Sequence, residues 1–140
     1  GPFPYFKCEN ISAYAKKNGI KVFYDKTYYK ESADLYLVAT YHKKIDIKKS
    51  TFKKGLNIHP SYLPQFPGKD PIKYALMSSA KYTGVSVHKL TNTIDKGKIL
   101  KKKKIFIKKS DNKSTILKKM LPIYGKYCNF ILNNYKALQL

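Results

Sequence analysis

The stretch from Gly55 to Leu100 constrains the fold more than any other part of this chain. It opens with a short apolar run, Leu56–His59, passes through a loop rich in proline and glycine, and reaches an alternating run, Thr83–Leu90. Alternation of apolar and polar residues is typical of a half-buried strand, whereas Pro and Gly interrupt regular structure. The pattern predicts two strands joined by a loop and by a helix that begins at Pro71, since proline suits a first helical turn.

The same rules place the other elements. A helix over residues 11–16 should stop at Asn18-Gly19, because glycine commonly follows a helix end. From about Asn112, apolar residues recur at helical spacing, which predicts a long terminal helix with Pro122 as a candidate kink. Lysines at 101–104 are typical of an exposed edge strand. Further runs predict strands over residues 20–24, 34–40 and 99–107. Strands that alternate with helices imply an α/β fold with a mainly parallel sheet flanked by helices.

Length and composition limit the class of protein and the number of domains. A chain of 140 residues suits one domain, residues 3–140, and Gly1-Pro2 is typical of the remnant of a cleaved tag. A hydrophobic fraction of 43% excludes wholesale disorder. No apolar run approaches the roughly 20 residues of a membrane span, and no signal peptide opens the chain, so we expect a cytoplasmic protein. Cys8 and Cys128 lack metal or redox spacing, and free thiols are favoured over a disulfide.

The net charge of +21 raises nucleic acid or an anionic membrane as a partner. All 29 basic residues, however, are lysines. Phosphate-reading sites usually include arginine for its planar, bidentate donors. A solvated basic surface and an anion-attracting surface therefore have about equal support, nucleic acid stays open as a partner without being favoured, and no membrane partner is expected.

Three short motifs within the stretch from Gly55 to Leu100 form one signature. Their residues are Asn57-x-His59-Pro60-Ser61-x-Leu63-Pro64, then Thr83-Gly84-Val85, and finally Ile94-Asp95-x-Gly97. The signature resembles that of the 10-formyltetrahydrofolate-dependent formyltransferases, a family that includes glycinamide ribonucleotide, methionyl-tRNA and nucleotide-sugar formyltransferases. The resemblance is close from Gly55 to Leu100 and looser back to Ile11. It implies a formyltransferase-like, partly Rossmann-like domain.

Relatives in that family open with a first strand, a glycine-containing turn and a second βα unit that have no counterpart here. By this resemblance the chain is N-terminally truncated, either as a fragment or as a reduced member. A homodimer is expected to cover the exposed flank of the sheet, because an unpaired strand edge favours aggregation.

Formyl transfer to an amine requires an oxyanion donor and a proton relay. Asn57 offers an amide N–H to the oxyanion, and His59 can shuttle a proton near neutral pH. Asp95 can orient His59 and hold a proton-relaying water. Each of these residues alone is more often structural, but the complete motif favours a catalytic set. By resemblance, His88 supports the site from behind.

The resemblance also implies a folate co-substrate without a metal. The pterin would lie between the segment 39–45 and the loop 91–97. The candidate folate contacts are Ala39, Thr40, Tyr41, Ile45, Asn92, Thr93 and Ile94. The candidate acceptor loop comprises Ser61, Leu63, Pro64 and Gly68.

The sequence specifies the formyl acceptor less closely than it specifies the reaction. Lys69-Asp70-Pro71 before a helix resembles several amino-sugar enzymes, so a nucleotide-linked amino sugar is the expected acceptor. Glycinamide ribonucleotide and methionyl-tRNA are the alternatives. Two other functional classes stay open: an inactive or weakly active fragment with a binding or scaffold role, and a lysine-rich nucleic-acid-binding module.

Overall fold

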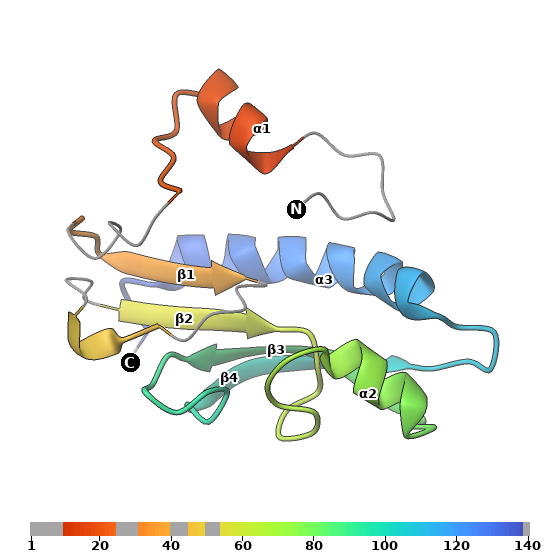
Figure 1. Ribbon diagram of the computed structural model, residues 1–140. Helices are drawn as coiled ribbons and strands as arrows, with labels where there is room; N and C mark the ends of the chain where they lie inside the picture. The colour runs from red at the N-terminus through yellow and green to blue at the C-terminus, as the bar shows by residue number, and fades with distance from the viewer. Residues whose placement is uncertain (1–9, 25–30, 40–44, 50–53, 139–140) are drawn as a thin grey trace.

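The computed structural model describes residues 10–24, 31–39, 45–49 and 54–138. Within these ranges, four strands form one sheet in the order β1-β2-β3-β4, and the long helix α3 runs along it (Figure 1). The elements are α1 (Ile11–Lys17), β1 (Leu35–Ala39), a 3-10 turn η2 (Ile47–Lys49), β2 (Lys54–His59), α2 (Pro71–Met77), β3 (Tyr82–Lys89), β4 (Ile99–Phe106) and α3 (Lys113–Asn134).

The α/β class and the long C-terminal helix are confirmed, but the described sheet is mixed where a mainly parallel one was expected. β1 and β2 pair in parallel, whereas β2 with β3 and β3 with β4 pair antiparallel. Residues 90–98 explain the last pairing, because a parallel connection needs a crossover of a dozen or more residues and this link is shorter. β4 lies at the sheet edge, as its lysines predicted.

The prediction of a strand over residues 20–24 is wrong. The structure gives this segment no regular secondary structure. Ile20 and Tyr24 are exposed over 55% and 75% of their surfaces, and Lys21 lies over the ring of Phe23 instead. Alternation describes a residue pattern, but a strand also needs a neighbouring strand to pair with, and this segment pairs with no strand among the described residues.

The core lies between one face of the sheet and α3. Strand residues that alternate toward this face are fully buried, and α3 covers them with its own apolar stripe. The core residues are Leu56, Ile58, Val85, Val87, Ile105, Ile116, Met120 and Ile131, with Ile72 from α2. Asn112 begins α3 with a capping box, in which its side chain accepts from the Thr115 N–H and Thr115 bonds back to the Asn112 backbone. No helix within the described ranges is both long and apolar enough to cross a membrane.

The opposite face of the sheet carries polar residues. Side chains alternate along a strand, so Asn57 and His59 project away from α3 when Leu56 and Ile58 project toward it. His59 stands directly opposite Ser86 on β3, and Asn57 stands opposite His88. Directly opposite residues share a face, so β2 and β3 together present a polar row on which a site can be built.

Candidate active site

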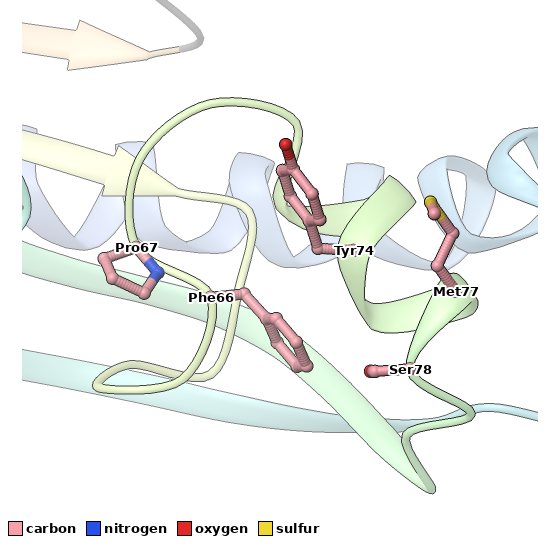
Figure 2. Close-up of a pocket in the computed structure, with 5 residues that line it drawn as sticks. All are labelled: Phe66, Pro67, Tyr74, Met77 and Ser78. Atoms are coloured by element: carbon pink, nitrogen blue, oxygen red, sulfur yellow. The ribbon is translucent and has the colours of Figure 1, made fainter.

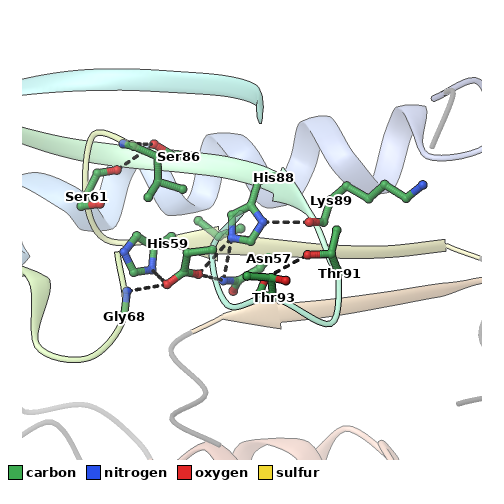
Figure 3. Close-up of polar contacts among 12 residues, drawn as sticks. Asn57, His59, Ser61, Gly68, Ser86, His88, Lys89, Thr91 and Thr93 are labelled. Atoms are coloured by element: carbon green, nitrogen blue, oxygen red, sulfur yellow. Dashed lines mark hydrogen bonds and ion pairs between the residues drawn. The ribbon is translucent and has the colours of Figure 1, made fainter. Parts of the chain in front are cut away.

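Asp95 is the centre of the candidate site. Its partners Asn57, His59, Gly68 and His88 lie close together in Figure 3. Its Oδ1 accepts from Nδ2 of Asn57 at 3.2 Å and lies 3.1 Å from Nε2 of His88. Its Oδ2 accepts from the Gly68 N–H at 2.7 Å and lies 3.4 Å from Nδ1 of His59. The Asp95 side chain keeps only 6% of its surface exposed. The structure therefore brings together Asn57, His59 and Asp95, the predicted catalytic residues, and His88, the predicted support residue. Their catalytic roles stay predictions.

The turn between β3 and β4 presents Asp95. Asp95 adopts φ 54°, in the left-handed region that aspartate tolerates better than most residues. Two residues later, a Cβ on Gly97 would lie 1.7 Å from the carbonyl oxygen of Lys89. Only glycine permits this close backbone approach, so Gly97 fixes how tightly the turn folds back and where its carboxylate lies.

The Asp95 carboxylate is held ionised. Burial acts to raise its pKa, but the contact with His88, the hydrogen bond from the Gly68 N–H and the positive charge that His59 carries when it is protonated together outweigh burial and lower the pKa below its ordinary value of 3.8. An ionised carboxylate with four polar neighbours can only accept hydrogen bonds. Each neighbour that can donate a proton is thereby oriented toward it.

His59 is poised as a neutral base. Its Nε2 lies 2.9 Å from the carbonyl oxygen of Phe66, which can only accept, so this nitrogen carries the hydrogen. Burial lowers the pKa of His59 below 6.5, although the Phe66 carbonyl and Asp95 act in the opposite direction. In the neutral ring, Nδ1 then holds a lone pair toward Asp95. A proton that arrives at Nδ1 converts this contact into a short-range ion pair.

His88 closes the back of the site. Its Nδ1 donates to the carbonyl oxygen of Lys89 at 2.9 Å, and Asn57 Nδ2 lies 3.1 Å from its Nε2. When Nε2 is unprotonated it accepts one Asn57 hydrogen while the other goes to Asp95, and when it is protonated it donates to Asp95 Oδ1. The His88 side chain is 2% exposed, so it acts on Asn57 and Asp95 rather than on an incoming substrate.

The loop that follows β2 is fastened from within. Ser61 and Leu63 are fully buried, and the Ser61 hydroxyl donates to the Gln65 carbonyl at 2.6 Å. Ser86 accepts from the Leu63 N–H at 3.0 Å and donates to the Ser61 carbonyl at 2.7 Å. Ser61 and Leu63 thus shape the loop from inside, Pro64 is exposed, and Gly68 contacts Asp95 directly through its N–H.

Sequence reasoning missed Ser86 and the Phe66 carbonyl. Ser86 could have been found, because it lies two residues before His88 and must share its face of β3. A backbone carbonyl such as that of Phe66 carries no side-chain signature. Its role follows only from the path of the loop.

Two parts of the expected folate segments adjoin the candidate site, namely the end of β1 and the turn before β4. Ala39 ends β1 and pairs with Ile58, the residue that lies between Asn57 and His59 on β2. Ile45 is buried. Asn92, Thr93 and Ile94 lie exposed in the turn that carries Asp95. Thr40 and Tyr41 lie outside the described residues.

A shallow apolar pocket of about 510 Å³ lies beside the site, between the loop and α2 (Figure 2). It shares no residue with the expected folate contacts. Its lining is Phe66, Pro67, Tyr74, Met77 and Ser78. Phe66 connects the pocket to the site, since its backbone carbonyl holds His59.

Chemically, this arrangement combines a neutral imidazole, an ionised carboxylate and an amide in one buried cluster. Such a set can accept a proton at His59, stabilise the resulting charge with Asp95, and offer an amide N–H to a developing oxyanion.

The sequence profile of the formyl transferase family matches residues 2–126 of this chain. The methionyl-tRNA formyltransferase of Prochlorococcus marinus (strain MIT 9515) is 33% identical over 125 residues, which cover 79% of this chain and 37% of that protein. The chain thus spans just over a third of the length of this curated relative.

Two solved structures show the same fold. The N-formyltransferase from Helicobacter canadensis, in complex with folinic acid and dTDP-3-aminofucose, gives a TM-score of 0.75 at 22% identity, covering 90% of this chain and 48% of its own. Phosphoribosylglycinamide formyltransferase from Brucella melitensis gives 0.63 at 28% identity, covering 76% of this chain and 56% of its own.

Proposed function

Since this chain belongs to the formyl transferase family, we propose that it moves a formyl group from 10-formyltetrahydrofolate to a primary amine. The observation that carries this proposal is the convergence of Asn57 and His59 on Asp95, at 3.2 and 3.4 Å. 10-Formyltetrahydrofolate supplies the formyl carbon, which forms a bond to the amine nitrogen as its bond to the folate nitrogen breaks.

His59 and Asp95 carry the proton of this exchange. The attacking amine must lose a proton and the departing folate nitrogen must gain one. His59 is neutral near pH 7 because burial lowers its pKa, so its Nδ1 can take up that proton. The ionised Asp95 then stabilises the imidazolium until the proton is returned.

Asn57 supplies the oxyanion donor. Its amide nitrogen Nδ2 lies 3.2 Å from Oδ1 of Asp95 and 3.1 Å from Nε2 of His88, and both distances are near the long end of the hydrogen-bond range. One of the two amide hydrogens can turn toward the formyl oxygen as negative charge develops there. Donors of this kind are worth about 3–4 kcal/mol of transition-state stabilisation in other enzymes.

The folate would contact the segments around residues 39–45 and 91–97. Ile94 leaves 56% of its surface exposed directly beside the buried Asp95, which suits an apolar, flat ring. Ala39, Thr40, Tyr41, Ile45, Asn92 and Thr93 complete the proposed contact set.

The acceptor we propose is a nucleotide-linked amino sugar. Lys69 and Asp70 are exposed immediately before α2, next to the pocket lined by Phe66 and Tyr74. Aromatic walls suit a nucleobase or sugar ring, and the Lys69 ammonium suits a diphosphate. The Helicobacter canadensis complex supports this acceptor to the extent that its fold accommodates such a sugar. Glycinamide ribonucleotide and methionyl-tRNA are the alternative acceptors.

A panel of amine acceptors tests the proposal. The chain is incubated with 10-formyltetrahydrofolate and a dTDP- or UDP-amino sugar, glycinamide ribonucleotide or charged initiator tRNA, and both the formylated product and tetrahydrofolate are measured. We expect turnover with the amino sugar. Turnover with another acceptor would change only the proposed acceptor and leave the proposed reaction in place. No turnover with any of them favours a binding or scaffold role.

Asp95→Asn provides the matched variant for the same assay. It should lower kcat/KM by about 10²-fold or more, because it removes the charge that stabilises protonated His59. Asp46→Asn removes a partly exposed carboxylate directly before η2 and should leave turnover unchanged. Equal activity in both variants would contradict the proposed role of Asp95.

A further inference from the structure

The outer part of the polar sheet face carries a set of lysines and aromatic rings. Side chains two residues apart on β4 share a face, and Lys102, Lys104 and Phe106 are placed on the face that bears Ser86 and Gly84. Tyr62 and Tyr82 lie beneath the two lysines, with ring centroids 5.6 Å apart in an edge-to-face arrangement. We call these five residues the β4 surface.

The two tyrosines order the two lysines. The ammonium of Lys102 lies 4.2 Å from the centroid of Tyr62, and that of Lys104 lies 4.2 Å from the centroid of Tyr82. Lys102 also donates to the carbonyl oxygen of Leu63 at 3.0 Å. A lysine usually loses much rotamer freedom when it binds an anion, and side chains that are already ordered lose less.

Within the described ranges, no carboxylate forms an ion pair with Lys102 or Lys104. Both are exposed, and each ammonium keeps donors for an external acceptor. The neighbouring Lys101 and Lys103 project to the other face, where Lys101 lies over Phe130 of α3, and they add to the local positive potential.

Phe106 completes the β4 surface with a bare ring. It is 70% exposed and stands opposite Tyr82, one step beyond Lys104 in the same row. Successive positions in this row lie about 7 Å apart, two strand residues of about 3.4 Å each. A cationic track followed by a free aromatic face is the combination that single-stranded nucleic acid needs, with phosphates on the cations and a base stacked on the ring.

We propose that the β4 surface binds single-stranded nucleic acid, with phosphates at Lys102 and Lys104 and an unpaired base on Phe106. This surface is distinct from the Asn57–His59–Asp95 cluster, since β3 with Ser86 lies between Lys102 and His59. Binding here requires neither folate nor formyl transfer, so it is measured separately from the proposed activity.

The test uses fluorescence anisotropy with labelled oligouridylate and oligothymidylate of about 12 nucleotides, titrated between about 50 and about 200 mM salt. We expect both strands to bind and the affinity to fall steeply with salt. Lys102→Gln with Lys104→Gln should reduce the slope of log affinity against log salt by about 1.4, for two lost phosphate contacts. Phe106→Ala should weaken binding about tenfold or more while leaving the slope unchanged.

Lys16→Gln with Lys17→Gln on α1 is the control, since it removes the same charge from exposed positions elsewhere. Lys104→Gln alone serves if loss of the Lys102 contact to the loop disturbs folding. No binding at about 50 mM salt would overturn the proposal. An equal reduction of the salt slope in the Lys102/Lys104 and Lys16/Lys17 variants would also overturn it, because the binding would then depend on the overall charge of the chain and not on this surface. So would binding to phosphatidylserine vesicles without binding to either oligonucleotide.

Discussion

The backbone N–H of Gly68 donates a 2.7 Å hydrogen bond to Oδ2 of Asp95. Gly68 lies in the loop after β2 and adopts φ 86°, a backbone conformation that favours glycine. Asp95 lies in the turn before β4. This single bond ties together the two irregular segments that enclose His59, and it helps to keep the carboxylate ionised.

The low pKa of His59 predicts how stability depends on pH. The folded protein binds a proton at His59 less readily than the unfolded chain, whose histidine has a pKa near 6.5. The stabilisation is therefore present above pH 6.5 and is lost as the pH falls toward the folded pKa. Urea unfolding at pH values on both sides of this window measures it, and His59→Gln should flatten the dependence. An unchanged dependence in His59→Gln would assign it to other groups.

Ser86→Ala should disturb the loop after β2. It leaves the buried Leu63 N–H and Ser61 carbonyl without their partner, which costs about 1–3 kcal/mol of unfolding free energy. Because the same loop positions Phe66 and Gly68, formyl transfer should also slow. Ser78→Ala removes a more exposed hydroxyl bonded to Ala75 and should change stability by less than about 0.5 kcal/mol. Similar losses in both variants would argue against a positioning role for Ser86.

Lys54→Met should loosen the C-terminal end of α3. The Lys54 ammonium donates to the carbonyls of Tyr135, Lys136 and Leu138, at 2.6, 3.1 and 2.7 Å. Helix ends leave carbonyls unpaired, and a cation satisfies them, so we expect a loss of about 1–2 kcal/mol. Hydrogen exchange should rise first at the end of α3. Lys126→Met, on an exposed position of α3, should leave exchange there unchanged.

Two glycines should respond in opposite directions to alanine. In Gly97→Ala the new Cβ would meet the Lys89 carbonyl at 1.7 Å, so the turn must open, and we expect a loss of about 2 kcal/mol or more. Gly125 lies in α3 with open space around its Cβ position, so Gly125→Ala should stabilise the protein by about 0.5–1 kcal/mol. Thermal unfolding measures both changes, and a stable Gly97→Ala would contradict the geometry of the turn.

Local chemistry made several elements predictable. Pro71 begins α2, Asn112 caps α3, and the alternation along β2 puts Asn57 and His59 on one face. These features depend on residues close together in the chain, so the sequence alone carries them. The proximity of the catalytic candidates was also predictable, because their motif as a whole resembles a known family.

Other features depend on which strands become neighbours, and no local pattern specifies that. Residues 20–24 alternate like a strand but have no strand partner in the described structure. The described sheet is mixed because β3 pairs antiparallel with both β2 and β4, and only the β4 pairing follows from the short link at 90–98. The partners of Asp95 include the backbone N–H of Gly68, a main-chain group that has no side-chain signature in the sequence.

The amino-acid sequence by itself determined the charge of the chain, the order of its main elements and the residues available for formyl transfer. Only the tertiary structure decided that Lys102 and Lys104 lie over Tyr62 and Tyr82 rather than spreading into solvent. It likewise decided that Asp95, far along the chain from Asn57 and His59, becomes their common neighbour. The physical reason is that side-chain type is local, whereas burial, orientation and pKa arise from contacts between segments that the fold alone brings together.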